Sequence, residues 1–293
     1  MTLVVAFAPG GASDALARLV AQAASKKLGQ PIIVDNRAGG GGTLAARGVV
    51  RAPANGYTLM LGSPGSMIIN PLLQPNLPYA TASFTPVAPL ARINYALMVR
   101  DGVDARSVKD LVNLSKSLPN GLTVGSAGVG SNTHLVAMSF IARTGAKLRH
   151  IPYKGTSPAM SDLMAGNIDV LFDSVPVVLP QVQNRKFRVL AVTGANRDSV
   201  MPKTPTVAES GWAGFAAANW FGIFAPPHTP APIIEKLSAA FAASLEEPDT
   251  RSRLEASGNR PVIGTPNDLE QLLQTETTAY RNLIRDAKIT LDE

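Results

Sequence analysis

Short apolar runs alternate along the chain with longer stretches in which apolar residues recur at helical spacing. Residues 3–6 form the first apolar run, which has no polar break and is typical of a strand covered on both faces of a parallel sheet. Leucine, valine and alanine then recur on one face of residues 16–28, and Gly29 stands where a helix C-terminal cap belongs. The pattern predicts a strand, a tight turn and a helix that Ser13 or Asp14 caps.

The same alternation continues to the other end of the chain. Further strands are predicted over residues 31–35, 57–61, 122–124, 168–172, 187–192 and 220–225. Helices are predicted over residues 43–51, 107–118, 157–165, 231–245, 250–256 and 268–287, and from the turn at 125–131 to about 144. The proline-rich residues 70–89 are expected to be mostly irregular, and a new pattern begins at 96–99. Strands that alternate with helices predict a mostly parallel α/β architecture.

Small-residue turns follow three of the predicted strands. The first contains Gly10 and Gly11, the second contains Ser63 and Ser66, and the third spans residues 125–131. Glycine lets the backbone turn tightly, and a helix that starts at such a turn directs free N–H groups and its positive dipole end toward a ligand. These turns suit an anion, although any α/β protein needs turns of this kind. The repeated unit predicts two lobes whose loops meet at one cleft.

Length and composition describe a globular protein of two lobes. A chain of 293 residues is too long for one ordinary core and suits two lobes of roughly 100 to 150 residues each. No apolar run reaches the roughly 18 residues that a membrane helix needs, so no membrane-spanning segment is expected. The formal charge of +6 comes from scattered lysine and arginine residues, and aromatic residues make up only 5%, which argues against nucleic-acid binding.

Cysteine is absent from the chain, which excludes disulfides, thiolate nucleophiles and cysteine-bound metals. The absence fits a periplasmic protein and fits many cytoplasmic proteins equally well. The first predicted strand follows Met1 and Thr2 directly, so a secretory signal peptide, if the gene encodes one, has been removed from this sequence. The three histidines, His134, His150 and His228, lack the spacing of a metal site. No metal and no cofactor are expected.

Motifs of nucleotide hydrolases and serine hydrolases are missing. The turn at 125–131 lacks the lysine and serine or threonine pair that holds nucleotide phosphates. No serine of the turns has glycine both two positions before and two positions after it, which a nucleophile elbow requires. These absences favour a binding protein over an enzyme.

Three side chains near the turns have both a binding and a structural interpretation. His134 lies in the first turn of a predicted helix and either donates to a ligand or holds the loop before it. Asp14 is either a helix cap or an acidic ligand group. Asp173 follows a predicted strand at its carboxyl end, where ligands of open α/β sheets bind, and suits a hydroxyl or ammonium group. With Lys154 it forms the plausible acid–base pair if the protein is an enzyme.

Six segments together resemble one protein family. They are residues 3–18 (LVVAFAPGGASDALAR), 34–43 (VDNRAGGGGT), 70–86 (NPLLQPNLPYATASFTP), 125–134 (GSAGVGSNTH), 151–155 (IPYKG) and 170–174 (VLFDS). In register over essentially the whole chain, they are similar to the Bug family, the periplasmic solute-binding proteins of tripartite tricarboxylate transporters. The run of four glycines at 39–42 departs from the more mixed sequence that is usual in the family.

The resemblance implies a type II periplasmic-binding-protein fold, an α/β fold in which two lobes joined by two crossing hinge strands close on a ligand. By analogy, the first lobe comprises residues 1–98 and 221–293 and the second comprises residues 99–220, with crossings near 98–100 and 220–222. The loops of both lobes would grip a carboxylate, partly through ordered water. The ligand-binding residues carried over are Phe7, Ala8, Pro9, Gly10, Gly11, Ala12, Ser13, Asp14, Ser63, Ser66, Ser126, Ala127, Gly128, Val129, Gly130, Ser131, His134, Tyr153, Lys154, Gly155 and Asp173.

The hypothesis is therefore a periplasmic receptor, not an enzyme, that captures a small organic carboxylate and delivers it to a membrane transporter. It is expected to act as a monomer without a cofactor or metal, to have no nucleic-acid partner and not to insert into the membrane. Two alternatives stay open: an enzyme that acts on a small carboxylate on the same scaffold, and the effector-binding domain of a regulator. The absence of a helix-turn-helix segment weighs against the regulator.

Overall fold

The computed structural model describes residues 1–293 except 8, 40–41, 75, 185, 288 and 291–293. The chain divides into two compact units: unit 1 comprises Met1–Arg92 and Trp220–Arg281, and unit 2 comprises Ile93–Asn219 and Asn282–Glu293. The chain leaves unit 1 within strand β4 (Thr85–Arg100) and returns within strand β9 (Ala218–Ala225). The family resemblance implied crossings near 98–100 and 220–222.

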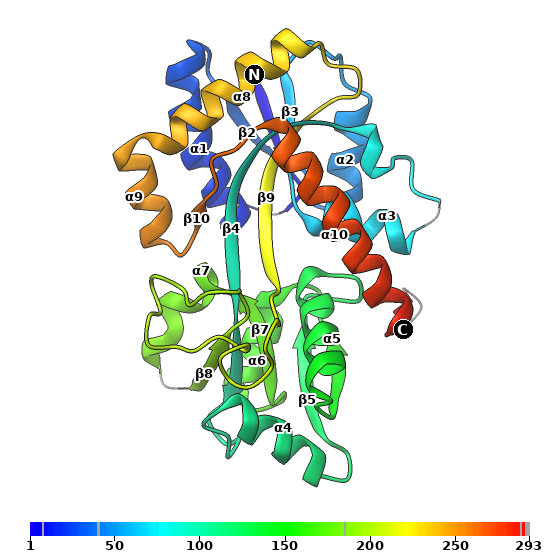
Figure 1. Ribbon diagram of the computed structural model, residues 1–293, viewed down its shortest axis with the longest axis vertical. Helices are drawn as coiled ribbons and strands as arrows, with labels where there is room; N and C mark the ends of the chain where they lie inside the picture. Colours follow the sequence, from blue (N-terminus) through cyan, green and yellow to red (C-terminus); the bar gives the residue numbers. More distant parts are fainter. Residues whose placement is uncertain (8, 40–41, 75, 185, 288, 291–293) are drawn as a thin grey trace. The chain divides into compact units, whose positions relative to one another are not determined.

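Unit 1 contains a mixed sheet (Figure 1). Its strands are β1 (Thr2–Val5), β2 (Ile33–Asn36), β3 (Thr58–Gly62), β10 (Arg260–Pro261) and parts of β4 and β9. Its helices are α1 (Ala12–Leu28), α2 (Thr43–Val50), the π-helix η2 (Gly65–Ile69), α3 (Asn70–Leu73), the 3-10 helix η3 (Thr81–Ser83), α8 (Ala231–Glu246), α9 (Pro248–Ala256) and most of α10 (Pro266–Asp286). β1 pairs in parallel with β2 and β3, while β9 is antiparallel to β3 and β10 is antiparallel to β4.

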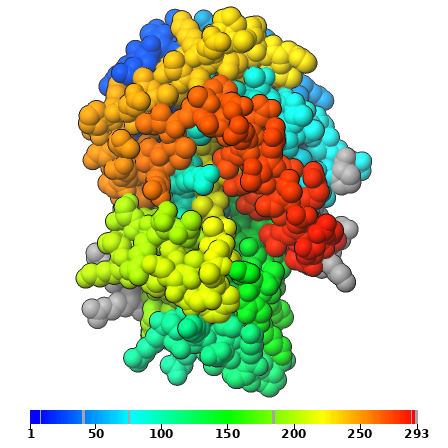
Figure 2. Space-filling model, viewed as in Figure 1, coloured from blue at the N-terminus to red at the C-terminus, as the bar shows by residue number. Residues whose placement is uncertain are grey.

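The central strand β1 is buried on both faces, as its apolar run predicts. Val4 packs with residues of α2 and α10, whereas Leu3 and Val5 are fully buried and alternate to the other face. Helix α1 packs against α8 and α9, and Figure 1 shows α1 and α2 on opposite sides of β1. Figure 2 shows α8 and α10 on the molecular surface. The carboxyl ends of β1, β2 and β3 therefore lie at one edge of a covered parallel sheet, where ligand loops of α/β proteins occur.

Unit 2 has a second mixed sheet. Its strands are β5 (Leu122–Ser126), β6 (Leu148–Pro152), β7 (Val170–Ser174), β8 (Phe187–Val192) and the rest of β4. Its helices are α4 (Val108–Ser117), α5 (Asn132–Thr144), α6 (Thr156–Ala165), α7 (Val175–Val178) and the 3-10 helix η4 (Leu179–Asn184). β5 pairs in parallel with β6 and β7, whereas β4 is antiparallel to β7 and β8.

Strand β4 separates two apolar cores in unit 2. Leu97 and Val99 belong to a cluster with α4 and α5, and Ala96 and Met98 belong to a second cluster with α6, α7 and β8. This alternation is that of a strand covered on both faces. The helices on each side of the sheet therefore fix the loops at the ends of β5 and β7.

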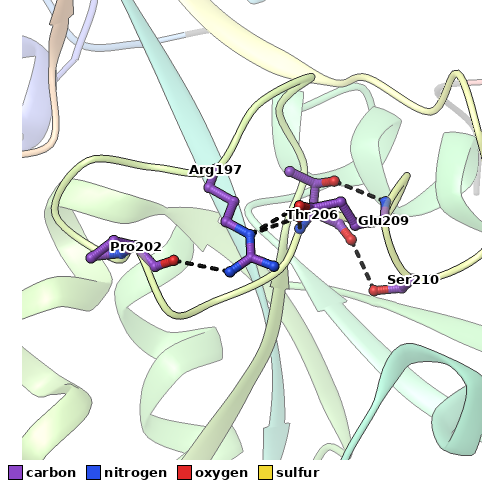
Figure 3. Close-up of polar contacts among 5 residues, drawn as sticks. All are labelled: Arg197, Pro202, Thr206, Glu209 and Ser210. Carbon is purple, nitrogen blue, oxygen red and sulfur yellow. Dashed lines mark hydrogen bonds and ion pairs between the residues drawn. The ribbon is translucent and has the colours of Figure 1, made fainter.

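Side chains hold the segment between β8 and β9 in place (Figure 3). Arg197 Nε lies 3.0 Å from each carboxylate oxygen of Glu209, and Arg197 Nη1 donates to the carbonyl oxygen of Pro202 at 3.1 Å. The Glu209 carboxylate also accepts the Thr206 N–H at 2.7 Å, and Ser210 Oγ donates to the Thr206 carbonyl oxygen at 2.8 Å. These bonds fold the segment into consecutive turns on unit 2.

The structure corrects the expectation for residues 70–89, which is that they are mostly irregular. They contain α3 and η3, and β4 begins at Thr85 and includes Pro86 and Pro89. Proline cannot donate to a strand ladder, and the ladder between β4 and β10 starts at Ala91, beyond both prolines. The expectation of a mostly parallel sheet is also modified, because β4 and β9 each pair antiparallel with a neighbour.

Candidate functional site

The turn after β1 carries N–H groups that no side chain caps. Helix α1 starts at Ala12, and its N-cap residue Gly11 makes no side-chain capping bond. The prediction that Ser13 or Asp14 caps the helix is therefore wrong, because both lie inside its first turn. Gly10 has a φ of 86°, a left-handed conformation that favours glycine. Among the described residues, no side chain caps the first turn of α1, and N–H groups at such a helix start have no intrahelical acceptor and suit an anion.

Asp14 fixes the shape of this turn. One of its carboxylate oxygens, Oδ2, accepts the Gly10 N–H and Arg18 Nε, each at 3.0 Å, and Oδ1 lies 3.0 Å from Arg18 Nη2. Burial alone would raise the pKa of Asp14, but the hydrogen bonds from Arg18, the Gly10 N–H and Asn36 lower it. Asn36 Nδ2 also donates to the Phe7 carbonyl oxygen at 3.1 Å. The ionised carboxylate is neutralised by Arg18 and holds the turn in place.

The turn after β1 lies next to the loops that follow β2 and β3. A Cβ atom on Gly42, which has a φ of 102°, would lie 3.1 Å from Ala6 Cβ and 3.2 Å from Ser66 Cβ, so this position needs glycine. Ser66 Oγ accepts the Ser63 N–H at 3.2 Å, and Ser63 Oγ is buried without a hydrogen-bond partner among the described residues. The loops that follow β1, β2 and β3 therefore converge. The predicted site residue Ala8 and the glycines at 40–41 lie outside the described residues.

The glycine loop of unit 2 uses most of its own N–H groups. The Ala127 N–H donates to Thr133 Oγ1 at 2.9 Å, and the Gly128 N–H donates to Ser126 Oγ at 3.1 Å. The Ser131 N–H donates to the Gly128 carbonyl oxygen at 3.1 Å, and Ser131 Oγ caps α5. Within the described part of the loop, no acceptor is found for the Val129 N–H. Hydrogen bonds within the loop and to the start of α5 thus occupy most of its described N–H groups and leave few of them for a ligand.

His134 is one of the braces of this loop. The Gly130 N–H donates to His134 Nδ1 at 3.2 Å, so that nitrogen carries no proton. The ring is 2% exposed and stacks on the His150 ring with a centroid distance of 4.0 Å. Burial and the neighbouring His150 lower the pKa of His134 to about 4. His134 is therefore neutral near pH 7 and has the contacts of a residue that positions the loop.

Ser126 and His150 complete this arrangement. Ser126 Oγ lies 2.6 Å from His150 Nε2, and Ser126 is fully buried. A buried hydroxyl that already accepts the Gly128 N–H is poorly placed to attack a substrate. His150 and Thr133 were absent from the predicted site residues. The parallel pairing of β5 with β6, which sets Ser126 opposite Pro152, brings His150 next to the loop, and the sequence alone carries no signal of this.

The strand ends of unit 2 hold Asp173 and the residues before α6. Gly155, with a φ of 124°, is the N-cap of α6, Lys154 is exposed, and Tyr153 Oη donates to Asp162 Oδ2 at 2.7 Å. Asp173 is 3% exposed, and its Oδ1 accepts the Ser174 N–H at 2.7 Å.

The other carboxylate oxygen of Asp173, Oδ2, is buried and has no close hydrogen-bond partner among the described residues. Burial raises the pKa of Asp173 to about 6, although hydrogen bonds from Ser174 and Thr156 act in the opposite direction. Among the ion pairs of the described residues, none joins Asp173 to Lys154. The two side chains considered as an acid–base pair thus make no direct ion pair among the described residues.

The described part of the chain contains no cluster of three or more histidine, cysteine, aspartate or glutamate side chains placed to hold a metal ion. Across the described residues, no helix combines the length and the hydropathy needed to cross a membrane.

Similarity to known proteins decides the family. The family model described as "Tripartite tricarboxylate transporter family receptor" matches residues 16–289. The chain belongs to this family. Among solved structures, R. palustris Rpa4515 with adipate has a TM-score of 0.91 and 35% sequence identity, over 99% of this chain and 97% of that protein.

Two further structures extend this family picture. The periplasmic binding protein BugD has a TM-score of 0.87 and 30% identity, over 99% of this chain and 98% of that protein. MatC (Rpa3494) from Rhodopseudomonas palustris with bound malate has a TM-score of 0.85 and 33% identity, over 97% of this chain and 98% of that protein. The resemblance to the Bug family is thereby confirmed, and the receptor has the α/β fold of these periplasmic binding proteins.

Proposed function

We propose that this family receptor is a periplasmic protein that binds a small organic carboxylate and passes it to the membrane components of its transporter. The observation that carries the proposal is the uncapped start of α1, where first-turn N–H groups have no side-chain acceptor. The family and the adipate-bound and malate-bound neighbours support the choice of a carboxylate. Neutral donors of this kind bind an anion without a fixed counter-charge, which favours release as well as capture.

In unit 1, we assign carboxylate binding to the turn after β1. The N–H groups of Ala12 and Ser13 point outward from the helix start, and Arg18 already neutralises Asp14, the acidic group of the turn. Phe7, Pro9, Gly10 and Gly11 shape the turn, and Ser63 Oγ is a buried hydroxyl still without a partner. Ser66 holds Ser63 and positions the next loop.

In unit 2, we assign to Val129 and Lys154 the contacts with the ligand, and to the other predicted residues a supporting role. The Val129 N–H lacks an acceptor and Lys154 is exposed, whereas Ala127, Gly128, Gly130 and Ser131 are tied to one another or to their neighbours. Ser126, His134, Tyr153, Gly155 and Asp173 hold the loop and the start of α6.

The free energies of these contacts are sufficient for the affinity expected of a transport receptor. Each favourable contact with a helix dipole contributes about 0.3 to 1 kcal/mol, and each hydrogen bond to a charged group contributes roughly 1.5 to 3 kcal/mol. A handful of such contacts reaches the roughly 8 kcal/mol of micromolar binding after the costs of ordering are subtracted. Binding and release explain these residues without a chemical step, so we propose no catalytic activity.

Titration calorimetry with a panel of acids tests the proposal. The panel contains adipate, malate, succinate, citrate, glutamate and benzoate, each titrated into the receptor at pH 7.5. We expect saturable binding of at least one member, with the ligand recovered chemically unchanged. If no acid of the panel binds, carboxylate binding is contradicted. If a bound acid is recovered as a converted product, the proposal that the receptor has no catalytic activity is contradicted. Loss of uptake of the bound acid on deletion of the receptor gene tests the link to a transporter.

A further inference from the structure

A half-buried carboxylate on α10, that of Glu276, contacts the strand by which the chain returns to unit 1. Trp220 Nε1 donates to Glu276 Oε2 at 2.6 Å. Trp220 is 2% exposed and is the first residue of unit 1 after the return, so its bond lies at the crossing within β9. The ring of Trp220 also packs 6.3 Å from the ring of Phe224, inside the core that contains Leu269 and Leu273 of α10.

The same carboxylate acts on the other crossing strand. Arg92 is the last residue of unit 1 before the chain leaves it within β4, and its charge lowers the pKa of Glu276. Burial has the larger, opposite effect, so the pKa of Glu276 is raised overall despite Arg92 and the Trp220 hydrogen bond. Tyr280, one turn further along α10, also faces Glu276, and Arg260 of β10 lies opposite Arg92. Glu276 therefore interacts with one residue of each crossing strand: Trp220 of β9 by a hydrogen bond and Arg92 of β4 by its charge.

A simple anchor for the helix would not require this carboxylate. Leu269 and Leu273 already attach α10 to the core by apolar packing. Burying a carboxylate costs free energy unless it is paired or hydrogen-bonded, so an apolar residue at position 276 would anchor the helix at lower cost. What the carboxylate adds is a directional, charge-assisted bond to Trp220, and such bonds are short and strong.

We infer that Glu276 is a positioning residue that holds the two crossing strands in one conformation and thereby sets how fast the ligand leaves, without touching it. The inference rests on the proposed function, because ligand release must be accompanied by changes at the strands that join the units. Conformational changes of this kind concentrate in a few terminal residues of elements, which absorb the backbone rotation. Arg92 and Trp220 are the residues at which the chain leaves and re-enters unit 1, so a rotation between the units would act on the backbone next to them.

Three variants separate the effect of the Trp220–Glu276 hydrogen bond from the effect of the packing of α10. Glu276→Met keeps the length of the side chain and removes the strong acceptor, whereas Glu276→Gln keeps an oxygen acceptor and removes the charge. Glu270→Met is the matched control, because Glu270 lies exposed on the same helix. All variants are made in a Trp212→Phe background, since the chain contains two tryptophans and emission then reports Trp220 alone.

Stopped-flow dissociation of whichever acid of the panel binds is the first measurement. We expect Glu276→Met to release the acid about tenfold faster, Glu276→Gln to restore most of the parent rate, and Glu270→Met to match the parent. A helix anchor alone predicts a lower unfolding temperature for Glu276→Met with an unchanged dissociation rate. That result, or equal rates in the Met and Gln variants, overturns the inference.

A second measurement needs no ligand and so distinguishes failure of this inference from failure of the proposed function. The emission of Trp220 in the parent should titrate with a midpoint above the ordinary glutamate range, and the step should vanish in Glu276→Gln. The pKa of Tyr280 is raised by burial and by Glu276, so the Tyr280 hydroxyl does not produce the step. A titration that persists in Glu276→Gln overturns the assignment even if the acids bind.

Discussion

Replacing Ala12 with proline removes one N–H group from the start of α1 and preserves the helix. Ala12 is the first helical residue, where the fixed φ and the missing N–H of proline are tolerated. Gly11, which precedes it, has a φ of −85° and a ψ of 174°, the extended conformation that a residue before proline prefers. The substitution therefore tests the donor itself, with little disturbance of the turn.

The expected loss follows from one charge-assisted hydrogen bond. Such a bond contributes about 1.5 to 3 kcal/mol, and about 1.4 kcal/mol corresponds to a tenfold change in affinity. We therefore expect the Kd of Ala12→Pro for its best acid to rise by about 10- to 100-fold. Titration calorimetry at constant pH and ionic strength measures the change, with the parent receptor titrated side by side.

The matched control is Ala231→Pro at the start of α8. Ala231 is exposed, it is the first residue of α8, and Pro230 before it already has an extended ψ of 141°. The control should bind with the affinity of the parent, and both variants should keep its unfolding temperature within a few degrees. An Ala12→Pro receptor that folds normally and binds as tightly as the parent refutes the assignment of the carboxylate to the start of α1.

Three further predictions concern the loops. Asp173→Asn should change how stability depends on pH, because the raised pKa means that folded Asp173 holds its proton more tightly than unfolded Asp173. The stabilising contribution of protonated Asp173 is fully present below about pH 4 and is lost as pH rises through about 6. Above that pH, ionised Asp173 lowers the free energy of unfolding of the parent by on the order of 3 kcal/mol, and the asparagine variant lacks this loss. Unfolding temperatures of parent and variant at pH 4.5 and 7.5 check this, and an equal pH dependence in both proteins would contradict it. Gly42→Ala should lower stability by about 1 to 2 kcal/mol more than Gly10→Ala, because both have positive φ but only at Gly42 would the new methyl group crowd other atoms; equal losses in thermal unfolding would show that crowding is unimportant. The ring signals of His134 in NMR spectra should not titrate between pH 5.5 and 8, since its pKa is lowered to about 4, and a midpoint near 6.5 would disprove the burial argument.

Short-range features of the fold follow from the sequence alone. The apolar run, glycine turn and helix at the start of the chain are present as β1, the turn and α1, and Gly29 ends α1 in the left-handed conformation. Gly166 ends α6 in the same way. These features are predictable because the groups that satisfy each helix end lie within a few residues of it, so the local sequence contains all the partners.

Features that depend on distant partners were decided only by the tertiary structure. Residues 70–89 suggest irregular chain, but β4 begins at Thr85 and runs through Pro86 and Pro89, and its ladder with the distant strand β10 starts beyond them at Ala91. The start of α1 moved to Ala12 because Asp14, expected as its cap, turns to Gly10 and Arg18 instead.

The chemistry of the loops shows the same division. Glycine and small residues mark where the turns are, and that much is visible in the sequence. The N–H groups of the glycine loop in unit 2 bond to residues within a few positions of them, whereas other contacts need distant partners. His134 stacks on His150 of β6, and Trp220 donates to Glu276 of α10. The sequence thus determined where the glycine turns form, because their partners are local, whereas sheet pairing and helix packing decided which distant side chains contact one another.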